Sequence, residues 1–380
     1  MQRKLFTEEQ NMFREAFCAF LQKEVVPNQE RWLEAGIIDR EIYRKAGKQG
    51  FLLCWADEQY GGLGLRDFRY DQIMMEELAL IGETGFGMGL HNRIVGPYID
   101  RFGSAEQKQR FLPGCISGET ILGVAMTEPD AGSDLAGMRS NAVDKGDHFV
   151  LNGAKTYISN GIQGDLFVVA AKSDPNNPRA IGLFLVERGM EGFSRGRKLK
   201  KMGYKSQDTA ELFFENVIIP KANVLGDSSK GFHYLMQGLA EERLQSGIRS
   251  IASAQYAFGL TKEFVCERKV FGKPLSSYQN TRFKLAQMST DIELAQVYAD
   301  RCVEVHNTGD LTGDDAARLK LFASEMQGRV VDECVQLHGG AGFMDEYPIS
   351  RAYSDARVTR IFAGSSEIMK EIIARSLDLK

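Results

Sequence analysis

The sequence predicts an α+β chain in which an N-terminal α-helical domain, a central antiparallel β barrel or sandwich and a C-terminal four-helix-type bundle follow one another. Apolar residues recur at helical spacing in the first and last thirds of the chain. Between residues 121 and 219 the pattern changes to short β-rich runs separated by glycine, asparagine and proline. We place the domain boundaries at 1–120, 121–229 and 230–380. Because no repeat or low-complexity linker separates these units, we expect them to pack as one body.

Composition narrows the class of protein. The chain has 380 residues, of which 43% are hydrophobic, so it can bury a large core. Its net charge of −4 gives no reason to expect a nucleic-acid partner, and no apolar run is long enough for a membrane span. The N-terminal residues carry early acids and no signal-peptide apolar region. We therefore expect a cytoplasmic protein, or a mitochondrial matrix protein if a presequence was removed.

The six cysteines predict neither disulfides nor a metal centre. They are scattered without a CxxC spacing, which is typical of reduced, mostly buried thiols. Cys334 and His338 lie one helical turn apart, but no second pair of ligands accompanies them. We therefore expect both to be structural and predict no metal.

The N-terminal third contains helix signals in order. Thr7 and Gln10 form a capping-box pattern before an amphipathic stretch that Pro27 ends, and Ser104 and Gln107 repeat the pattern. Further helices are expected near 39–49, 71–81 and 94–102. The glycine-rich segment 85–90 resembles a dinucleotide fingerprint, but its last position is Leu90 and it follows a helix rather than a strand. We interpret it as a bend between helices.

In the middle third, β-like runs are expected at 121–125, 149–151, 166–171 and 210–214, with turns at 146–147, 152–153 and 174–178. Two polar, glycine-rich segments, 126–134 and 153–161, lie at the ends of such runs. Segments of this kind can surround a flat polar ligand with backbone N–H groups, hydroxyls and one aromatic ring. Taken singly, each is equally well explained as a hairpin turn.

Helical signals return in the last third. Residues 232–269 contain no proline, Ser276 and Gln279 form a capping pattern for a helix to about residue 305, and a third helix is expected at 312–337. Glycines at 339–342 interrupt the pattern, and 365–377 closes the chain as a helix. Long antiparallel helices of this kind form a bundle.

Motifs spread over nearly the whole chain resemble the acyl-CoA dehydrogenase family. They occur in the family's order and spacing at residues 127–134, 157–161, 201–203, 210–216, 267–274, 279, 336–343, 346–348, 355–357 and 361–368. The resemblance implies FAD as cofactor, and oxidation of an acyl-CoA thioester to its trans-2-enoyl form in fatty-acid β-oxidation. It also implies a homo-oligomer, typically a tetramer, that passes electrons to an electron-transfer flavoprotein.

The resemblance assigns cofactor residues by position. The flavin ring would contact Met126, Thr127, Ser133, Tyr157, Ile158 and Ser159, with Ser133 also near the CoA moiety. The pyrophosphate and adenine end would be held by Arg268, Phe271, Gln279, Gln336, Gly339 and Gly340, supplied by a neighbouring subunit, with Ser365 and Glu367 also on the cofactor side. Without the other motifs, Arg268 would be interpreted as a surface ion pair and the paired glycines as a helix C-cap.

The catalytic base is the main departure from the family pattern. Many members carry a glutamate at the position of Ala363, which cannot remove a proton. The long-chain and isovaleryl-type members place it on another helix before an arginine, and the matching pair here is Glu242 and Arg243. We therefore expect Glu242 to be the base. Glu241 lies about 100° away around the helix, so its side chain should point elsewhere. The Glu241→Gln variant should therefore differ little from the parent protein.

The family resemblance also implies substrate contacts and leaves alternative functions open. Ser133, Arg243, Ala363 and Gly364 are expected on the substrate side, with the Ala363 N–H polarising the thioester carbonyl. Considered without the family, Glu241 and Glu242 would both be interpreted as solvated. The motifs as a whole resemble those of the long-chain type, which favours a long-chain or branched substrate. Pro97 could open space for an acyl tail. The alternatives are an acyl-CoA oxidase and an inactive protein of the same fold that only binds.

Overall fold

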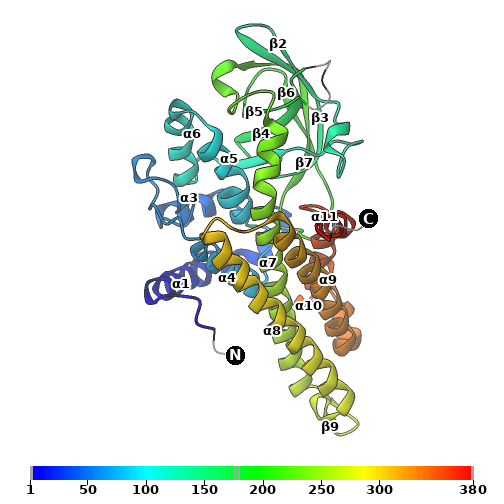
Figure 1. The fold of residues 1–380 in the computed structure, drawn as a ribbon. Coiled ribbons are helices and arrows are strands. Elements are labelled where there is room, and N and C mark those ends of the chain that lie inside the picture. Colours follow the sequence, from blue (N-terminus) through cyan, green and yellow to red (C-terminus); the bar gives the residue numbers. More distant parts are fainter. Residues whose placement is uncertain (1–2, 175–176, 178–179, 378–380) are drawn as a thin grey trace.

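In the computed structural model, described for residues 3–174, 177 and 180–377, helical segments precede and follow a seven-stranded sheet along the chain. Figure 1 shows the sheet at one end of the molecule and a long helical hairpin at the other. The predicted order of helices, sheet and helices is confirmed. The turn expected at 174–178 lies largely outside the described residues.

The N-terminal part consists of short helices packed on one another. They are α1 (Glu8–Phe20), the π-helical segment η1 (Leu21–Val25), α2 (Gln29–Ala35), α3 (Glu41–Lys48), α4 (Arg69–Leu80), the π-helical segment η4 (Leu90–Val95), α5 (Gly96–Phe102) and α6 (Ala105–Ser117). Both predicted capping boxes form, at Thr7 for α1 and at Ser104 for α6. Pro27 lies in a single 3₁₀ turn between η1 and α2.

The central sheet contains strands β1 to β7. They are β1 (Leu122–Ala125), β2 (Asn141–Asp144), β3 (His148–Ser159), β4 (Leu166–Lys172), β5 (Ile181–Glu187), β6 (Phe193–Lys198) and β7 (Thr209–Pro220). Their order is β1-β4-β2-β3-β7-β6, with β5 paired to β4. Most pairs are antiparallel, but β1 pairs with β4 in parallel, from Leu122 opposite Leu166 to Ala125 opposite Val169.

One predicted turn in the sheet is wrong. Asn152 and Gly153 lie inside β3, at a shift in its register against β7. Gly153 has a φ of +145°, and a Cβ there would lie 2.2 Å from Ser140 Oγ. The glycine therefore allows a bulge in a continuous strand, because only a residue without a side chain fits this close approach.

The C-terminal part is a bundle of long helices. They are α7 (Gly231–Glu267), α8 (Gln279–Asn307), α9 (Gly313–His338), α10 (Pro348–Ala356) and α11 (Ser366–Ser376), with the hairpin β8 (Lys269–Val270) and β9 (Lys273–Pro274) between α7 and α8. The 37 residues of α7 span about 55 Å. Thr312 caps α9 through its side chain. The capping role predicted for Ser276 is wrong, because Ser276 lies in a 3₁₀ turn and α8 begins after Tyr278.

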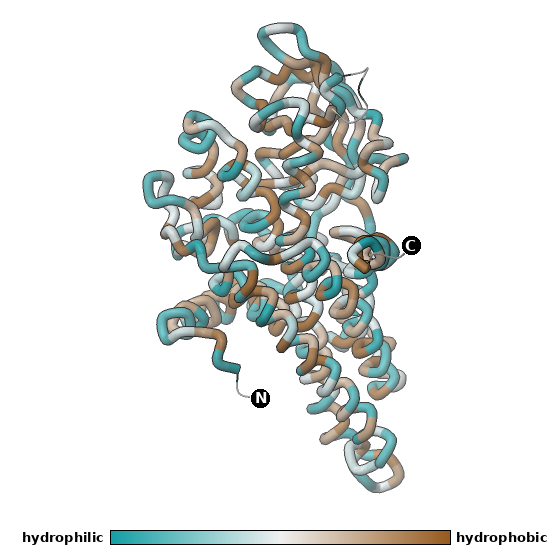
Figure 2. Tube along the Cα trace, in the orientation of Figure 1, coloured by the Kyte–Doolittle hydropathy of each residue, from teal (hydrophilic) through white to brown (hydrophobic). Residues whose placement is uncertain are grey.

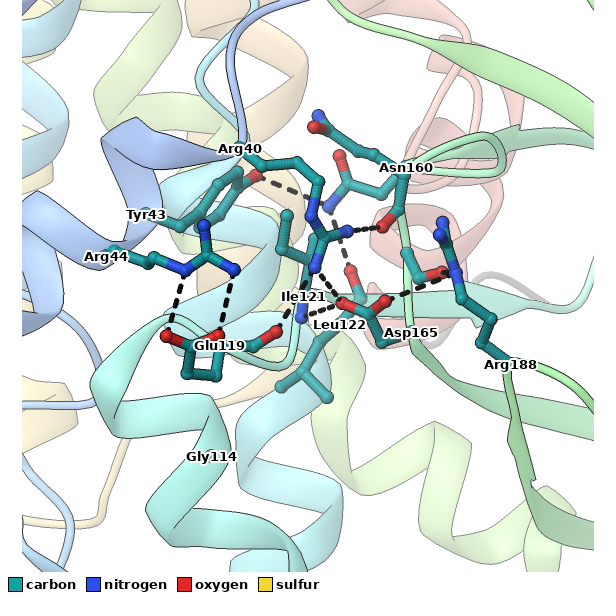
Figure 3. Close-up of polar contacts among 12 residues, drawn as sticks. Arg40, Tyr43, Arg44, Gly114, Glu119, Ile121, Leu122, Asn160, Asp165 and Arg188 are labelled. Carbon is teal, nitrogen blue, oxygen red and sulfur yellow. Dashed lines mark hydrogen bonds and ion pairs between the residues drawn. The ribbon is translucent and has the colours of Figure 1, made fainter.

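Polar contacts fix the sheet to the N-terminal helices (Figure 3). Asp165 accepts a hydrogen bond from the Ile121 N–H and forms ion pairs with Arg40 and Arg188. Asn160, just after β3, donates to the Leu122 carbonyl at 2.9 Å. The end of β3 is thereby held against the start of β1. The end of β3 carries three of the predicted flavin-ring residues.

The interior contains three hydrophobic clusters. One joins the N-terminal helices to residues of β1, β4 and β5, one lies in the C-terminal bundle and also includes Phe68 and Met75, and one lies within the sheet. Figure 2 shows hydrophobic segments gathered inside the sheet and between the packed helices, with hydrophilic segments on the outer loops. Within the described residues, no helix is both long enough and apolar enough to cross a membrane.

Candidate active site

A buried lysine holds the turn after β1 against β3. Lys155 is fully buried, donates to the Met126 carbonyl at 3.0 Å and pairs with the Glu128 carboxylate at 2.7 Å. Burial would raise the pKa of Glu128, but Lys155 and the Arg139 N–H outweigh this and lower it. The Thr156 N–H also donates to the Thr127 carbonyl. The segment 126–134 therefore lies beside the end of β3.

Tyr157 leaves the strand pattern at that end. Its φ is +59°, uncommon for a residue with a side chain, and its ring is 70% exposed. The register of β3 against β7 shifts between Lys155 and Ile158, which frees Tyr157 from the ladder. We call the six predicted flavin-ring residues on these two segments the sheet-side group: Met126, Thr127, Ser133, Tyr157, Ile158 and Ser159. The chain brings their two segments together.

The other six predicted cofactor residues form a second cluster, which we call the helix-end group: Arg268, Phe271, Gln279, Gln336, Gly339 and Gly340. All six are exposed, and Phe271 is 97% exposed. The end of α9 reaches the end of α7 because His338 stacks on Phe264, with ring centroids 4.2 Å apart. The predicted structural role of His338 is consistent with this, since its Nδ1 also bonds to the Cys334 carbonyl.

The two groups do not meet within one chain. Arg268 follows Glu242 by 26 residues of nearly continuous helix, which corresponds to about 39 Å along α7. Figure 1 shows the same separation, with the β8–β9 hairpin at the far end of α7 from the sheet. Within one chain, the helix-end group therefore lies far from Glu242 and from the sheet.

Glu242 is buried on α7 and faces α5. Its side chain is 6% exposed, and its Oε1 accepts a hydrogen bond from the Tyr98 hydroxyl at 3.2 Å. Burial raises the pKa of Glu242 to about 7, against the lowering effects of Tyr98 and Arg243. A small cavity adjoins the carboxylate and is lined by Ile94, Pro97, Tyr98, Phe102, Gly238 and neighbouring arginines.

Glu241 is also buried, so the interpretation of both glutamates as solvated is wrong. It is 4% exposed and forms ion pairs with Arg93 and Arg101. Burial opposes its charge, but His306, with its Nε2 3.7 Å from the Glu241 carboxylate, and the two arginines lower the pKa of Glu241 to about 2. The two adjacent carboxyls thus differ because one has cationic partners and the other has a neutral hydroxyl. Glu241 does point away from Glu242, as expected.

The predicted substrate-side segment after α10 has an unusual backbone. Ala363 and Gly364 have φ values of +53° and +91° in succession. Ser365 caps α11 by accepting from the Ile368 N–H, and Glu367 is exposed in the first turn of that helix. The Gly364 carbonyl accepts a hydrogen bond from Lys320 Nζ at 2.6 Å.

Two residues at the site were not predicted. Tyr98 follows Pro97, but nothing in the sequence marks its hydroxyl as a partner of Glu242. Lys320 does carry a signal, because it shares a helical stripe with Ala316, Ala317 and Ala323, where a surface lysine is not expected. A charged residue inside a stripe of small buried residues is a pattern that sequence reasoning could have used.

The two groups have the chemistry that FAD requires. A Cβ at Gly132, Gly339 or Gly340 would meet no atom within 4 Å, so a ligand can approach these backbones. The exposed rings of Tyr157 and Phe271 offer flat surfaces for flavin or adenine, and Arg268 can bind phosphate. Among residues 3–174, 177 and 180–377, no cluster of three or more His, Cys, Asp or Glu could hold a metal ion.

Family models cover almost the whole chain. They are described as the N-terminal domain of acyl-CoA dehydrogenase, matching residues 7–119, the middle domain, matching 123–217, and the C-terminal domain, matching 229–377.

Individual relatives agree with this result. The long-chain specific acyl-CoA dehydrogenase of Mus musculus mitochondria is 46% identical over 99% of this chain and 88% of that protein. The crystal structure of an acyl-CoA dehydrogenase from Geobacillus kaustophilus covers both chains completely, with a TM-score of 0.97 and 48% identity. An acyl-CoA dehydrogenase from Bacillus anthracis complexed with FAD matches 99% of this chain and 68% of that chain, with a TM-score of 0.92 and 30% identity.

Proposed function

This chain belongs to the acyl-CoA dehydrogenase family, and from that premise we propose that Glu242 is the base that removes the α-proton of a long-chain or branched acyl-CoA. The observation that carries the proposal is a buried carboxyl whose pKa lies near 7, beside a cavity that an acyl chain could enlarge and enter. At a pKa near 7, about half of the carboxyl is ionised at pH 7, and its basicity is high enough to accept a carbon-bound proton whose acidity the site increases.

FAD is the cofactor of this family, and when bound it accepts the hydride that leaves the substrate β-carbon. The chain's own residues do the remaining work. Glu242 takes the α-proton, and Tyr98 holds the carboxylate in place by hydrogen bonding to one of its oxygens. The sheet-side group and the helix-end group would hold opposite ends of the cofactor, each site taking one group from each of two subunits.

The backbone at Ala363 supplies the second part of the mechanism. Among the described residues, the Ala363 N–H has no hydrogen-bond acceptor. We propose that it donates to the thioester carbonyl, because charge develops on that oxygen as the α-proton leaves. An alanine offers this N–H as well as a glutamate would, so moving the base to Glu242 leaves the carbonyl contact intact.

The proposal of a long-chain or branched substrate rests on the relative from Mus musculus and on the cavity beside Glu242. Pro97, Phe102 and Gly238 line that cavity without a charge of their own. The proposed electron acceptor is an electron-transfer flavoprotein. Hydrogen peroxide formed at the rate of substrate turnover in air would instead identify an oxidase.

The test is Glu242→Gln. The variant should retain flavin and its visible spectrum, while the rate at which acyl-CoA bleaches the flavin anaerobically falls by about a thousandfold or more. A panel of straight and branched acyl-CoAs in the same titration reports the substrate class. Glu215→Gln, at an exposed glutamate of β7, is the matched control and should behave as the parent protein. Near-normal bleaching by Glu242→Gln would contradict the assignment.

A further inference from the structure

The bend between α10 and α11 places two left-handed residues side by side. Ala363 at +53° is unfavourable for a residue with a side chain, and Gly364 at +91° has a backbone conformation that residues with a side chain rarely adopt. Such a conformation persists only when surrounding contacts hold it. The contacts that hold this bend therefore matter for the direction of the Ala363 N–H.

Contacts exist on both sides of Ala363. Before it, the N–H groups of Ile361 and Phe362 donate to the Val358 carbonyl at 2.8 and 3.1 Å. After it, the Gly364 carbonyl accepts from Lys320 Nζ at 2.6 Å. Of the described polar groups, none accepts a hydrogen bond from the Ala363 N–H itself. The unpaired Ala363 N–H thus lies between the bonds to the Val358 carbonyl and the bond from Lys320 to the Gly364 carbonyl.

Lys320 is an unusual residue for a helix interior. It lies on α9 with no exposed surface, and no carboxylate of the described residues lies within ion-pair distance of its ammonium. Among the neighbouring charges, Arg243 of α7 has the largest effect and repels the ammonium, Glu367 of α11 and Glu325 of α9 attract it more weakly, and Arg360 repels it least. Burial, followed by Arg243, lowers the pKa of Lys320 to about 8. A buried cation without an anion reduces stability, which points to a role in function.

We propose that Lys320 is a positioning residue whose hydrogen bond to the Gly364 carbonyl fixes the Ala363 N–H in the direction that receives the substrate thioester carbonyl. The inference rests on the proposed acyl-CoA chemistry and extends it to a residue outside the substrate contacts. Because the lysine acts through one bend, losing it should affect the α-proton step more than ground-state binding of the substrate.

The experiment compares Lys320→Met with the parent protein as flavin-loaded enzymes. Methionine keeps the length of the side chain and removes the charge and the donor, so the fold should melt at the same or a higher temperature. We expect kcat to fall by about 30- to 100-fold, with KM for acyl-CoA changed by less than about threefold. Lys370→Met, at an exposed lysine on α11, is the control and should leave both unchanged.

A second readout does not depend on turnover. In a 3-thia-acyl-CoA, sulfur replaces the β-carbon, so the α-proton can be removed but no hydride can leave. The pH at which the bound analogue ionises, followed by absorbance, should rise by about one pKa unit in Lys320→Met, equivalent to a tenfold change in that equilibrium. A purely structural lysine would not shift this value.

Two results would overturn the inference: a lower melting temperature with unchanged kcat, or an analogue that ionises at the parental pH. If Lys320→Met does not fold, Lys320→Leu, which also lacks a hydrogen-bond donor, provides the same two readouts, and parental values in it have the same meaning. The base assignment is judged separately by Glu242→Gln. Full activity of Lys320→Met beside an inactive Glu242→Gln removes only the role of the lysine.

Discussion

Adjacent glutamates on α7 show how partners decide the behaviour of a carboxyl. Glu241 and Glu242 are buried to a similar extent, yet their pKa values are about 2 and about 7. Arg93, Arg101 and His306 compensate Glu241, whereas Glu242 has the Tyr98 hydroxyl and a more distant Arg243. The helical offset of about 100° between neighbours sends them into these two environments.

The Tyr98 hydroxyl stabilises the charged form of Glu242, so Tyr98→Phe should raise the pKa of Glu242 further. The base works only when ionised, so the acid limb of the pH profile of kcat should move to higher pH. Activity at pH 6 should fall several-fold, whereas activity at pH 9 should be nearly parental. A profile recorded from pH 5.5 to 9.5 measures the shift. An acid limb at its parental position would show that Tyr98 does not contact the working carboxylate.

The expectation that Glu241→Gln is nearly silent needs revision, because Glu241 is a buried anion between two cations. The substitution should destabilise the fold by about 3 kcal/mol, since it leaves Arg101 and part of Arg93 uncompensated. The pKa of Glu241 is lowered in the folded state, so its contribution to stability is present above the ordinary glutamate pKa of 4.5 and is lost as pH falls toward 2. Urea unfolding at pH 7 and pH 4 should show a smaller difference at pH 4.

The residues that the sequence could not predict are those whose role depends on another element. The position of Glu242 in the family's sequence pattern identified it as the expected base. Its partner Tyr98, however, comes from α5, 144 residues earlier. The burial of Glu241 similarly depends on Arg93 and Arg101, which lie far away in the chain. Spacing along one helix gives the direction of a side chain, whereas its partner is set by how helices cross.

At the scale of elements, α5 and α7 enclose the cavity beside Glu242 at a point where α7 has no side chain. Gly238 precedes Glu242 by one helical turn, and a Cβ there would lie 2.9 Å from the Tyr98 hydroxyl. The helix accepts a glycine here at a cost in helical propensity of about 1 kcal/mol relative to alanine. The space it leaves is adjacent to the proposed base.

Gly238→Ala should therefore narrow the entrance for the acyl chain while stabilising α7. We expect kcat/KM to fall about tenfold or more for long and branched acyl-CoAs, and less for short ones, because the added methyl group meets Tyr98. A series of acyl lengths assayed with both proteins provides the measurement. Gly259→Ala, on the same helix with nothing within 4 Å, is the control. Equal losses at every length would contradict a role in chain accommodation.

Local signals predicted some elements well and others badly. The capping boxes at Thr7 and Ser104 formed because every interaction they need lies within four residues. Asn152-Gly153 has the residue types of a hairpin turn. Pairing of β3 with both β2 and β7, however, keeps this strand continuous through a bulge. Ser276 has the spacing of a cap, but a 3₁₀ turn moves the helix start beyond it. Tertiary pairing decided both failures.

At the scale of the whole molecule, the predicted cofactor residues divide into the sheet-side group and the helix-end group, and Arg268 of the helix-end group lies about 39 Å along α7 from Glu242. The family resemblance assigned the helix-end group to a neighbouring subunit, and no composition or spacing rule would have done so. Its exposed Phe271 and the open space at Gly339 and Gly340 are surfaces that a second copy could use. We therefore propose that every cofactor site takes residues from two chains.

Subunit mixing tests this arrangement. A Glu242→Gln subunit lacks the base but has an intact Arg268, and an Arg268→Ala subunit has the reverse. Each homo-oligomer should be poorly active when FAD is limiting, the first in chemistry and the second in cofactor retention. In a mixed pair, however, the Glu242 of one subunit meets cofactor held by the Arg268 of the other. One of the two sites is then complete, so activity should return.

Mixed oligomers can be obtained by co-expressing the two variants with different affinity tags and purifying through both tags. Their activity per subunit at limiting FAD should exceed that of either variant alone by about tenfold or more, approaching half the parental value, since one site in each mixed pair is intact. A double variant, Glu242→Gln with Arg268→Ala, mixed with parental subunits controls for simple averaging. If Arg268 served the cofactor of its own chain, no mixed site would be complete, and co-expression would add nothing to the activity of the separate variants.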